Sequence, residues 1–297
     1  MPDGTMPEAA WKRTPYQQRD AHLIDYQTYH LPGIYEEFRG PRVTGEKFVV
    51  CVGAAQTFGR FVVAPYPMLI SRALGIEVLN LGRGGAGPTF PLSNPLLLEH
   101  INRARVAIVQ VFSGRSQSNS LFQTVNHGMR GINRTDGRLV SASDFYTWLL
   151  QQDEQLARKI VAETRVNYVR AMTDLLNAIA TPKVLLWFSV RTPEYQEQWS
   201  LPAHRLLGEF PQLVNRGMVN QLRDRCNVYV ECVSRRGLPQ PLTRRGGQAG
   251  MPDDSLLPGP EGELKTENRY YPSPEMHEDA AELLIPACRK LLDGRQS

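Results

Sequence analysis

The sequence has few cysteines, no long hydrophobic run and no recognisable leader segment. Its four cysteines are irregularly spaced, without a Cys-x-x-Cys pair or a Cys/His cluster, which argues against a disulfide framework and a zinc site. The longest apolar runs, such as residues 106–112, fall far short of the roughly 20 residues that a membrane helix needs. The first twenty residues carry several charges and no apolar core of a signal peptide. We therefore predict a cytoplasmic protein with no membrane span, no metal and no cofactor.

A strong excess of one charge is also missing. The 34 Lys and Arg residues against 30 Asp and Glu residues leave a net charge of +4 over 297 residues. So small a surplus does not indicate a nucleic-acid-binding protein, although it is compatible with an anionic small molecule. The length is near the upper limit for one hydrophobic core, so we predict a single domain over residues 46–297. Residues 1–45 are expected to form an N-terminal arm on its surface, and the oligomeric state is not indicated.

Five short apolar segments alternate with segments of helical periodicity. Strands are expected at residues 48–52, 77–81, 106–112, 184–190 and 228–233, and helices at 55–75, 92–103, 156–179, 211–223 and 275–292. The first of these helices is expected to be bent or delayed by Pro65 and Pro67 and to end at Gly75. Continuous apolar strands separated by helices predict an α/β fold, a doubly wound three-layer sandwich around a five-stranded, mainly parallel sheet. Two segments depart from the alternation. One is a helical insertion at about 120–180, and the other is a long Gly/Pro-rich loop at 237–262.

Four small, polar or basic segments follow the ends of predicted strands. They are residues 53–59, 82–88, 113–119 and 191–194. Ligands in such sheets bind beyond the carboxyl ends of the strands, so we predict a ligand crevice where these segments meet.

The first two of these segments offer main-chain donors. Gly53, Gln56 and Thr57 belong to a strand-to-helix turn, where backbone amides and the helix N-terminus favour an anion or a developing oxyanion. Gly82 begins a glycine-rich turn that allows close approach of the backbone to a ligand. The alternative is that both turns serve only to pack helix against strand.

Polar side chains gather in the third segment and at the last helix. Ser113, Arg115, Ser116 and Asn119 are candidate substrate-binding residues, because Arg115 can hold a carboxylate, sulfate or phosphate in two hydrogen bonds. The alternative for this segment is a helix N-cap, where Ser and Asn are favoured. His277 opens the last helix and is a candidate general base, provided that a carboxylate orients its second nitrogen. An exposed or capping histidine is the alternative.

The order of these segments resembles the SGNH/GDSL hydrolase superfamily. There the first strand ends in Gly-Asp-Ser-x-Thr with a nucleophilic Ser, the second in Asn-x-Gly and the third in Gly-x-Asn, and Asp-x-x-His opens the last helix. The matching positions here are Gly53, Thr57, Phe58, Gly59, Asn80, Gly82, Gly114 and His277. The resemblance implies that His277 is the base, together with Gln56 and Thr57 as further candidate catalytic residues. It also implies that amides of the Gly53 turn and Gly82 form an oxyanion hole.

The departures from this pattern concern the catalytic positions themselves. Ala55 stands where the nucleophile belongs, Ala54 and Pro274 replace the two acids, and Ser116 replaces the Asn of the third block. An alanine cannot attack a carbonyl, which excludes the usual serine mechanism at that position. The chain also has Phe38-Arg39-Gly40-Pro41, a Gly-x-x-x-Thr-Phe-Gly turn at 53–59, Val-Gln-Val at 109–111 followed by a Ser-Asn pair, and Leu-Leu-Trp-Phe at 185–188. Through these segments it is similar, from about Asp25 to Leu292, to an uncharacterised bacterial domain family, and this resemblance brings no known activity.

Three functions are compatible with these residues. The first is an SGNH-like enzyme of altered mechanism, hydrolysing or transferring a group on an acyl, sugar or small anionic substrate. Attack would come from water, from a substrate hydroxyl or from a displaced serine. The second is a sulfotransferase-like enzyme with an adenosine phosphosulfate donor, suggested by residues 106–120, although the Gly53 turn lacks a basic residue and Arg60 is displaced from it. The third is a non-catalytic binding protein. In each case the expected partner is a small molecule or carbohydrate.

Overall fold

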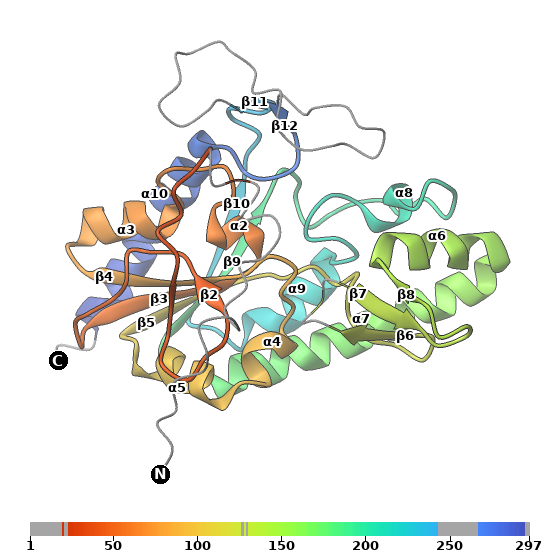
Figure 1. The fold of residues 1–297 in the computed structure, drawn as a ribbon, viewed down its shortest axis with the longest axis horizontal. Helices are drawn as coiled ribbons and strands as arrows, with labels where there is room; N and C mark the ends of the chain where they lie inside the picture. The colour runs from red at the N-terminus through yellow and green to blue at the C-terminus, as the bar shows by residue number, and fades with distance from the viewer. Residues whose placement is uncertain (1–19, 21–22, 126–127, 129, 243–266, 295–297) are drawn as a thin grey trace.

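A parallel sheet of five strands lies at the centre of the protein, in the order β10-β9-β5-β3-β4 (Figure 1). The computed structural model describes residue 20 and residues 23–125, 128, 130–242 and 267–294. The strands are β3 (Phe48–Gly53), β4 (Glu77–Gly82), β5 (Val106–Gln110), β9 (Lys183–Ser189) and β10 (Val228–Val233). All neighbouring pairs within this sheet are parallel. The predicted strands and their parallel pairing are confirmed.

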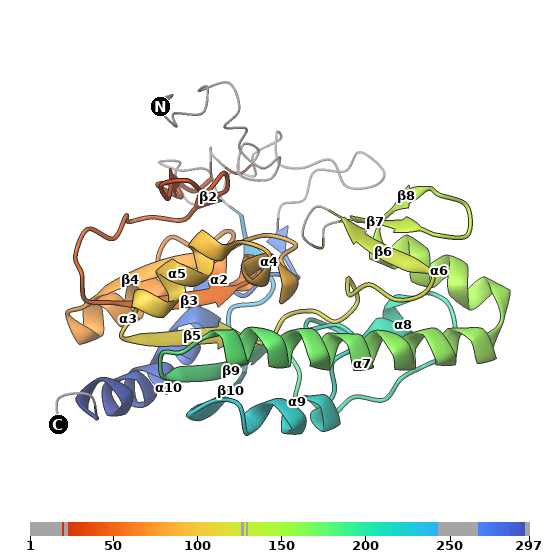
Figure 2. The same cartoon turned by 90° about the horizontal axis from the view of Figure 1, so that it is seen from below.

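Helices cover both faces of this sheet, as Figure 2 shows. Val50 and Val52 contribute to a cluster on one face, and Val49 and Cys51 to a cluster on the other, because side chains alternate along a strand. The first face packs against α4 (Thr89–Leu92), α5 (Pro95–Arg103), α7 (Glu154–Ala178) and α9 (Arg216–Arg223). The second face packs against α3 (Tyr66–Leu74) and α10 (Pro274–Asp293). The expected three-layer α/β sandwich is therefore present.

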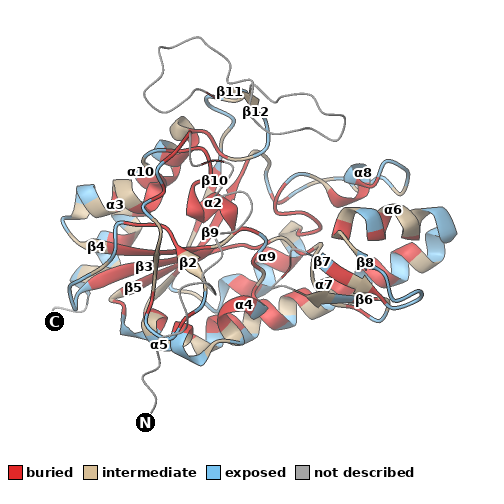
Figure 3. Cartoon of the chain, viewed as in Figure 1, coloured by how far each residue is buried: buried red, intermediate tan, exposed pale blue. Residues whose placement is uncertain are grey.

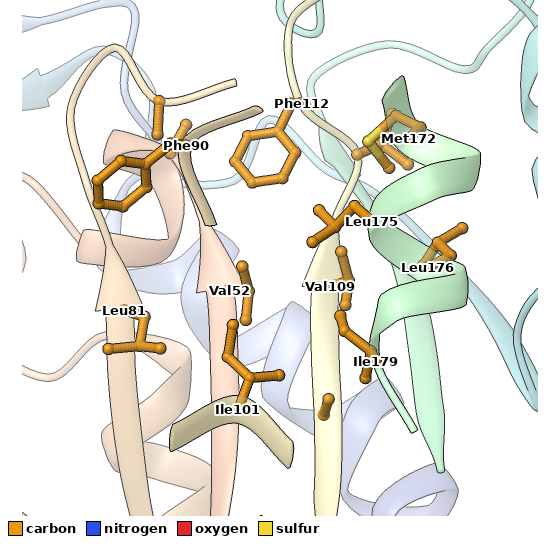
Figure 4. Close-up of a cluster of buried hydrophobic side chains, with 14 of the residues drawn as sticks. Val52, Leu81, Phe90, Ile101, Val109, Phe112, Met172, Leu175, Leu176 and Ile179 are labelled. Atoms are coloured by element: carbon orange, nitrogen blue, oxygen red, sulfur yellow. The ribbon is translucent and has the colours of Figure 1, made fainter. Parts of the chain in front are cut away.

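Both faces of the central strands are apolar because both are covered (Figure 3). On the first face Val52, Leu81 and Val109 pack between Ile101 of α5 and Leu175 of α7 (Figure 4). This continuous burial explains why the strands appear in the sequence as unbroken apolar runs rather than as alternating ones.

The helix expected at 55–75 is interrupted. It forms α2 (Ala55–Phe58) and α3, with a turn between them that begins at Gly59. Gly59 has φ of 76°, a left-handed conformation that ends a helix, and Pro65 then precedes the first turn of α3. Gly75, also left-handed with φ of 63°, ends α3 at the predicted residue.

Two other helices are shorter than predicted because asparagines cap them. The Oδ1 of Asn94 accepts the N–H of Leu97 at 3.2 Å, so α5 begins at Pro95 rather than at residue 92. Asn215 caps α9 in the same way through the N–H of Met218, at 3.1 Å.

The insertion between β5 and β9 begins with strands that the sequence analysis did not predict. Its elements are β6 (Phe122–Val125), β7 (Arg130–Asn133), β8 (Leu139–Val140), α6 (Ala142–Gln152) and α7, and the three strands pair antiparallel. These strands have two to four residues each, too few for a periodic pattern to emerge. Phe122, Phe145 and Ile160 share a buried cluster with Leu206 of α8 (His204–Leu207), so the insertion has a core of its own.

The N-terminal segment is anchored to the sheet by a buried arginine. It contains the paired strands β1 (Tyr29–His30) and β2 (Glu37–Phe38), and Arg39 next to them is 2% exposed. The Arg39 guanidinium donates to four backbone oxygens in the α2–α3 connection, those of Phe58 (3.1 Å), Gly59 (2.6 Å), Val62 (2.6 Å) and Val63 (2.9 Å). The rest of the predicted arm, residues 1–19, lies outside the described residues.

Two short strands border the predicted Gly/Pro-rich loop. They are β11 (Gln240–Pro241) and β12 (Glu267–Asn268), which pair antiparallel. Residues 243–262 of the predicted loop are outside the described part of the chain. Within the described part, no helix has both the length and the apolar character required to cross a bilayer.

We predict that Arg39→Met destabilises the protein strongly. The substitution leaves buried carbonyl oxygens without their charged donor, so the free energy of unfolding should fall by about 3 kcal/mol or more. Urea denaturation of the full chain measures the free energy of unfolding. Arg42→Met, which replaces an exposed arginine, is the matched control. Equal stability of the two variants would show that Arg39 does not hold the α2–α3 connection.

Candidate functional site

A crevice lies at the carboxyl ends of the central strands. It consists of two pockets of about 230 and 240 Å³ that have lining residues in common. The shared residues are Gln56, Arg115, Ser143, Phe210, Gln212 and Tyr270. We call these two pockets together the crevice.

Three of the four segments predicted to meet at the strand ends do so. Residues 54–56 after β3, 84–86 after β4 and 113–116 after β5 all contribute to the crevice lining. The fourth segment, 191–194, contributes none of the residues that line it. Arg191 of that segment instead donates to the backbone oxygens of Pro211 (2.7 Å) and Val214 (2.9 Å), which fixes the loop before α9.

The candidate residues divide into two groups. Gln56, Ser113, Arg115 and Ser116 line the crevice. The lining does not include the other five candidates, which are Gly53, Thr57, Gly82, Asn119 and His277.

The two glycines serve close packing. A Cβ atom at Gly53 would lie 2.0 Å from Thr57 Oγ1, and one at Gly82 would lie 2.1 Å from the backbone nitrogen of Phe58. The N–H of Gly82 donates to Asn80 Oδ1 at 2.9 Å, so this amide is already used within the protein. The geometry favours the packing interpretation of both turns over the oxyanion interpretation.

Thr57 of α2 is fully buried and forms a hydrogen bond with a glutamine that the sequence analysis missed. Its hydroxyl donates to Gln110 Oε1 at 2.7 Å, and the same oxygen accepts the N–H of Ala54 at 3.0 Å. Gln110 therefore fixes the start of α2 from the neighbouring strand β5. A single amide within the apolar run 106–112 was the signal that could have identified it.

Asn119 stabilises a loop rather than a ligand site. Its Oδ1 accepts the N–H groups of Leu121 (2.9 Å) and Phe122 (2.8 Å), and its Nδ2 donates to Thr164 Oγ1 at 2.9 Å. All of these partners belong to the insertion, so Asn119 joins the first insertion strand to α7.

His277 folds back to the strand ends but caps a helix there. The ring is fully buried, and its Nδ1 accepts the N–H of Tyr66, the first residue of α3, at 3.0 Å. The hydroxyl of Tyr66 in turn lies 3.0 Å from Thr57 Oγ1, which connects the imidazole to the α2 turn. The N-terminal amides of a helix need such acceptors because they have no partner within the helix.

This hydrogen bond places the imidazole proton on the wrong nitrogen for a general base. Because Nδ1 accepts, the neutral ring carries its proton on Nε2, whereas a catalytic base needs a free lone pair there. Burial, together with the nearby charge of Arg39, lowers the pKa of His277 to about 3. The residue three positions earlier is Pro274, which offers no carboxylate. The geometry thus argues against the base role inferred from the superfamily resemblance.

Arg115 is a cation at the crevice without an acidic partner. In the described part of the chain no carboxylate forms an ion pair with it, and its Nη1 lies 3.5 Å from Ser143 Oγ. An arginine in this state is suited to bind an anion in the crevice.

Two buried glutamines present carbonyl oxygens that lack a donor. Gln56 and Gln212 are each 3% exposed, and the Oε1 of each has no hydrogen-bond partner among the described residues. The Nε2 of Gln212 donates to the hydroxyl of Tyr270 at 2.9 Å, which leaves its oxygen as the acceptor. Buried amide oxygens are normally satisfied, so a crevice lined by both is suited to a ligand with N–H or O–H donors.

An exposed aromatic ring completes the lining. Tyr270 is 46% exposed and packs at right angles to Tyr271, with ring centroids 4.9 Å apart. The sequence analysis missed Tyr270 and Gln212 as site residues, although the Tyr-Tyr pair before the last helix was a usable signal. Gln212 lies in a loop whose sequence gives no such indication.

Arg60, the basic residue considered for binding a phosphosulfate donor, already has partners within the protein. Arg60 forms an ion pair with the buried Asp20, with Nε 2.7 Å from Oδ2, and its Nη1 donates to the hydroxyl of Tyr271 at 3.0 Å. These contacts use the Arg60 guanidinium within the protein. Among the described residues, no group of three or more His, Cys, Asp or Glu side chains is placed to hold a metal ion.

We predict that burial of neutral His277 makes the protein less stable in acid. Its pKa is about 3 in the folded state against an ordinary value of 6.5, so between these values the unfolded chain binds a proton that the folded chain does not. Stability then falls with decreasing pH through this window, with a slope that approaches about 1.4 kcal/mol per pH unit from this group. Urea denaturation from pH 7 to pH 4 should give a smaller slope for His277→Gln than for the exposed-site control His204→Gln. Identical slopes would contradict a buried neutral imidazole.

Comparisons with solved structures give distant likenesses. A phospholipase A1 from Streptomyces albidoflavus NA297 is 10% identical over 82% of this chain and 98% of that chain, with a TM-score of 0.43. A protein provisionally named as an SGNH hydrolase, from Slackia heliotrinireducens, is 14% identical over 82% of this chain and 98% of that chain, with a TM-score of 0.40. A family two carbohydrate esterase from Clostridium thermocellum is 12% identical over 87% of this chain and 68% of that chain, with a TM-score of 0.38.

The description of the Slackia protein names the superfamily that the sequence motifs resemble. No curated protein matches the sequence. A family described as a domain of unknown function (DUF6473) matches residues 15–147 and 142–292, and the chain belongs to this family.

Proposed function

We propose that the crevice binds a small anionic carbohydrate, or a similar anion with several hydroxyl groups, without serine-esterase catalysis. The observation that carries this proposal is Arg115, a cation without a carboxylate partner among the described residues, at the lining shared by both pockets. Of the three functions considered from the sequence, this is the binding protein.

The absence of esterase chemistry is supported by the residues around the α2 turn. Ala54 and Ala55 line the crevice with methyl groups where the superfamily has an acid and a nucleophile. His277, the candidate base of the superfamily resemblance, caps α3 with Nδ1 and holds its proton on Nε2. Neither a nucleophile nor a base is therefore available in the arrangement that the superfamily uses.

An anionic group on the ligand is supported by the state of Arg115. Its planar guanidinium can donate two parallel hydrogen bonds to a carboxylate, and such charge-assisted bonds are roughly twice as strong as neutral ones. The hydroxyl groups of Ser113, Ser116 and Ser143 line the same pocket and can contribute further hydrogen bonds.

Hydroxyl groups on the ligand are supported by the two unpartnered amide oxygens. Gln56 and Gln212 offer acceptors at 3% exposure, where a donor from the ligand recovers the cost of burying them. The exposed ring of Tyr270 gives an apolar surface beside these polar groups, a combination typical of small-molecule sites. An acidic sugar has all the matching features, namely a carboxylate, several hydroxyl donors and an apolar ring face.

We predict that glucuronate binds the protein and that glucose binds more weakly. Arg115→Gln should weaken glucuronate binding by roughly 10- to 100-fold, the range expected for a hydrogen bond to a charged group, and change glucose binding much less. Isothermal titration calorimetry measures both ligands.

The exposed Arg225 provides the matched control, since Arg225→Gln removes the same charge outside the crevice lining. Equal loss of glucuronate affinity in both variants would mean that only the overall charge matters. Failure of glucuronate to bind the wild-type protein at millimolar concentration would refute the proposed ligand class.

We also predict that Ala55→Ser alone does not create an esterase. The new hydroxyl meets no base, because the Tyr66 N–H occupies His277 Nδ1 and Nε2 keeps its proton. Hydrolysis of 4-nitrophenyl acetate should remain at the level of wild type, with no burst of nitrophenol, while glucuronate binding shows that the variant is folded. A burst would mean that His277 reverses its hydrogen bonding and serves as a base.

A further inference from the structure

A separate pocket of about 360 Å³ lies at the amino ends of the strands, the edge of the sheet opposite the crevice. Lys47 directly precedes β3, Arg105 directly precedes β5, and Arg289 belongs to the final turns of α10. Figure 1 shows the C-terminal end of α10 close to this edge. We call this the basic pocket.

The basic pocket gathers positive charge that the described residues do not neutralise. Its three cations face one carboxylate, that of Asp293, and none of the three forms an ion pair in the described part of the chain. The C-terminal ends of α3 and α10 border the pocket and favour nearby cations through their exposed carbonyl groups. These carbonyl groups explain why cations are tolerated here. They do not provide a hydrogen-bond acceptor for every N–H group of the three cations.

The unsatisfied donor belongs to Arg105. Its Nε is buried and has no hydrogen-bond partner among the described residues. Its backbone N–H donates to the oxygen of Phe48 at 2.8 Å, which fixes the start of the side chain between β3 and β5. A buried guanidinium N–H without an acceptor is costly. The Arg105 side chain also lines the pocket, where an anion can accept hydrogen bonds from its other N–H groups.

Aliphatic side chains form the remaining wall. Leu74, Ile76 and Leu292 line the pocket together with the cations. A volume of about 360 Å³ lies within the range of about 300–1,000 Å³ typical of ligand pockets, which is more than an inorganic ion needs. The occupant that fits both walls has an anionic head and an apolar body.

We propose that the basic pocket binds a phosphate monoester with an apolar body. A phosphate monoester carries about −1.5 to −2 charges at pH 7, which matches the surplus of cations better than a monovalent carboxylate does. Its oxygens accept hydrogen bonds from Arg105 and Arg289, and its apolar body packs against Leu74 and Leu292. This site is separate from the crevice and does not depend on the function proposed for it.

Phenyl phosphate is the probe that tests this site, with inorganic phosphate as the head group alone. Isothermal titration calorimetry of the full chain should show that phenyl phosphate binds at least tenfold more tightly than inorganic phosphate. Arg105→Gln and Arg289→Gln should each weaken phenyl phosphate binding at least tenfold. Arg103→Gln, an exposed arginine near Arg105 that does not line the pocket, should leave it unchanged.

Two results would overturn the proposal. One is the absence of phenyl phosphate binding by wild type at millimolar concentration. The other is binding that is lost in Arg115→Gln and kept in Arg289→Gln, which would place the ligand in the crevice. Arg289 is exposed on α10, so its variant remains informative if Arg105→Gln fails to fold.

Discussion

The position of α2 depends on polar side chains that reach its backbone from other elements. A helix of four residues is not stable by itself, because the cost of nucleation exceeds what so few hydrogen bonds return. Gln110 of β5 accepts the N–H of Ala54, Asn80 of β4 donates to the Thr57 oxygen at 3.0 Å, and Arg39 donates to the oxygens of Phe58 and Gly59. These three side chains fix both ends of α2. They thereby also fix the crevice wall formed by Ala54, Ala55 and Gln56.

The same contacts account for several residues that resemble the catalytic blocks of the superfamily. Gly53 and Gly82 are glycines because α2 approaches β3 and β4 too closely for a Cβ atom. Thr57 and His277 are tied into one buried network through Tyr66. In this network Nδ1 of His277 already accepts a hydrogen bond from the backbone. The ligand-binding groups that we propose at the crevice, above all Arg115 and Gln212, lie outside this network.

Sequence reasoning predicted the central sheet and the place of the crevice because both follow from local patterns. Unbroken apolar runs identified each strand of the central sheet, and the small or polar residues after β3, β4 and β5 identified the edge where the ligand site lies. The strands of the insertion were not predicted, because they are too short to show a periodic pattern. The prolines at 65 and 67 indicated an irregular helix, but the break at Gly59 was not predicted, because a left-handed glycine is recognised by its backbone angle.

The individual site residues were less predictable, for a different physical reason. Gln212 and Tyr270 are far apart in sequence and become site residues only because a hydrogen bond joins them at the crevice. The role of His277 depends on which of its nitrogens accepts a hydrogen bond, and the donor is a backbone N–H 211 positions away. Residue type and spacing describe what a side chain can do, whereas its protonation and partners are set by tertiary contacts that no local pattern records.

The helix α10 reaches both ends of the sheet and therefore decides whether the two proposed sites can influence each other. Met276 in its first turn lines the crevice, and Arg289 near its end lines the basic pocket. A helix of 20 residues spans about 30 Å, and α10 is packed along this length against the core through Ala280, Leu284 and Cys288. Coupling between two sites requires an element with two arrangements that each ligand favours differently. A helix fixed by a close-packed core offers one arrangement, so the two sites are expected to bind their ligands independently.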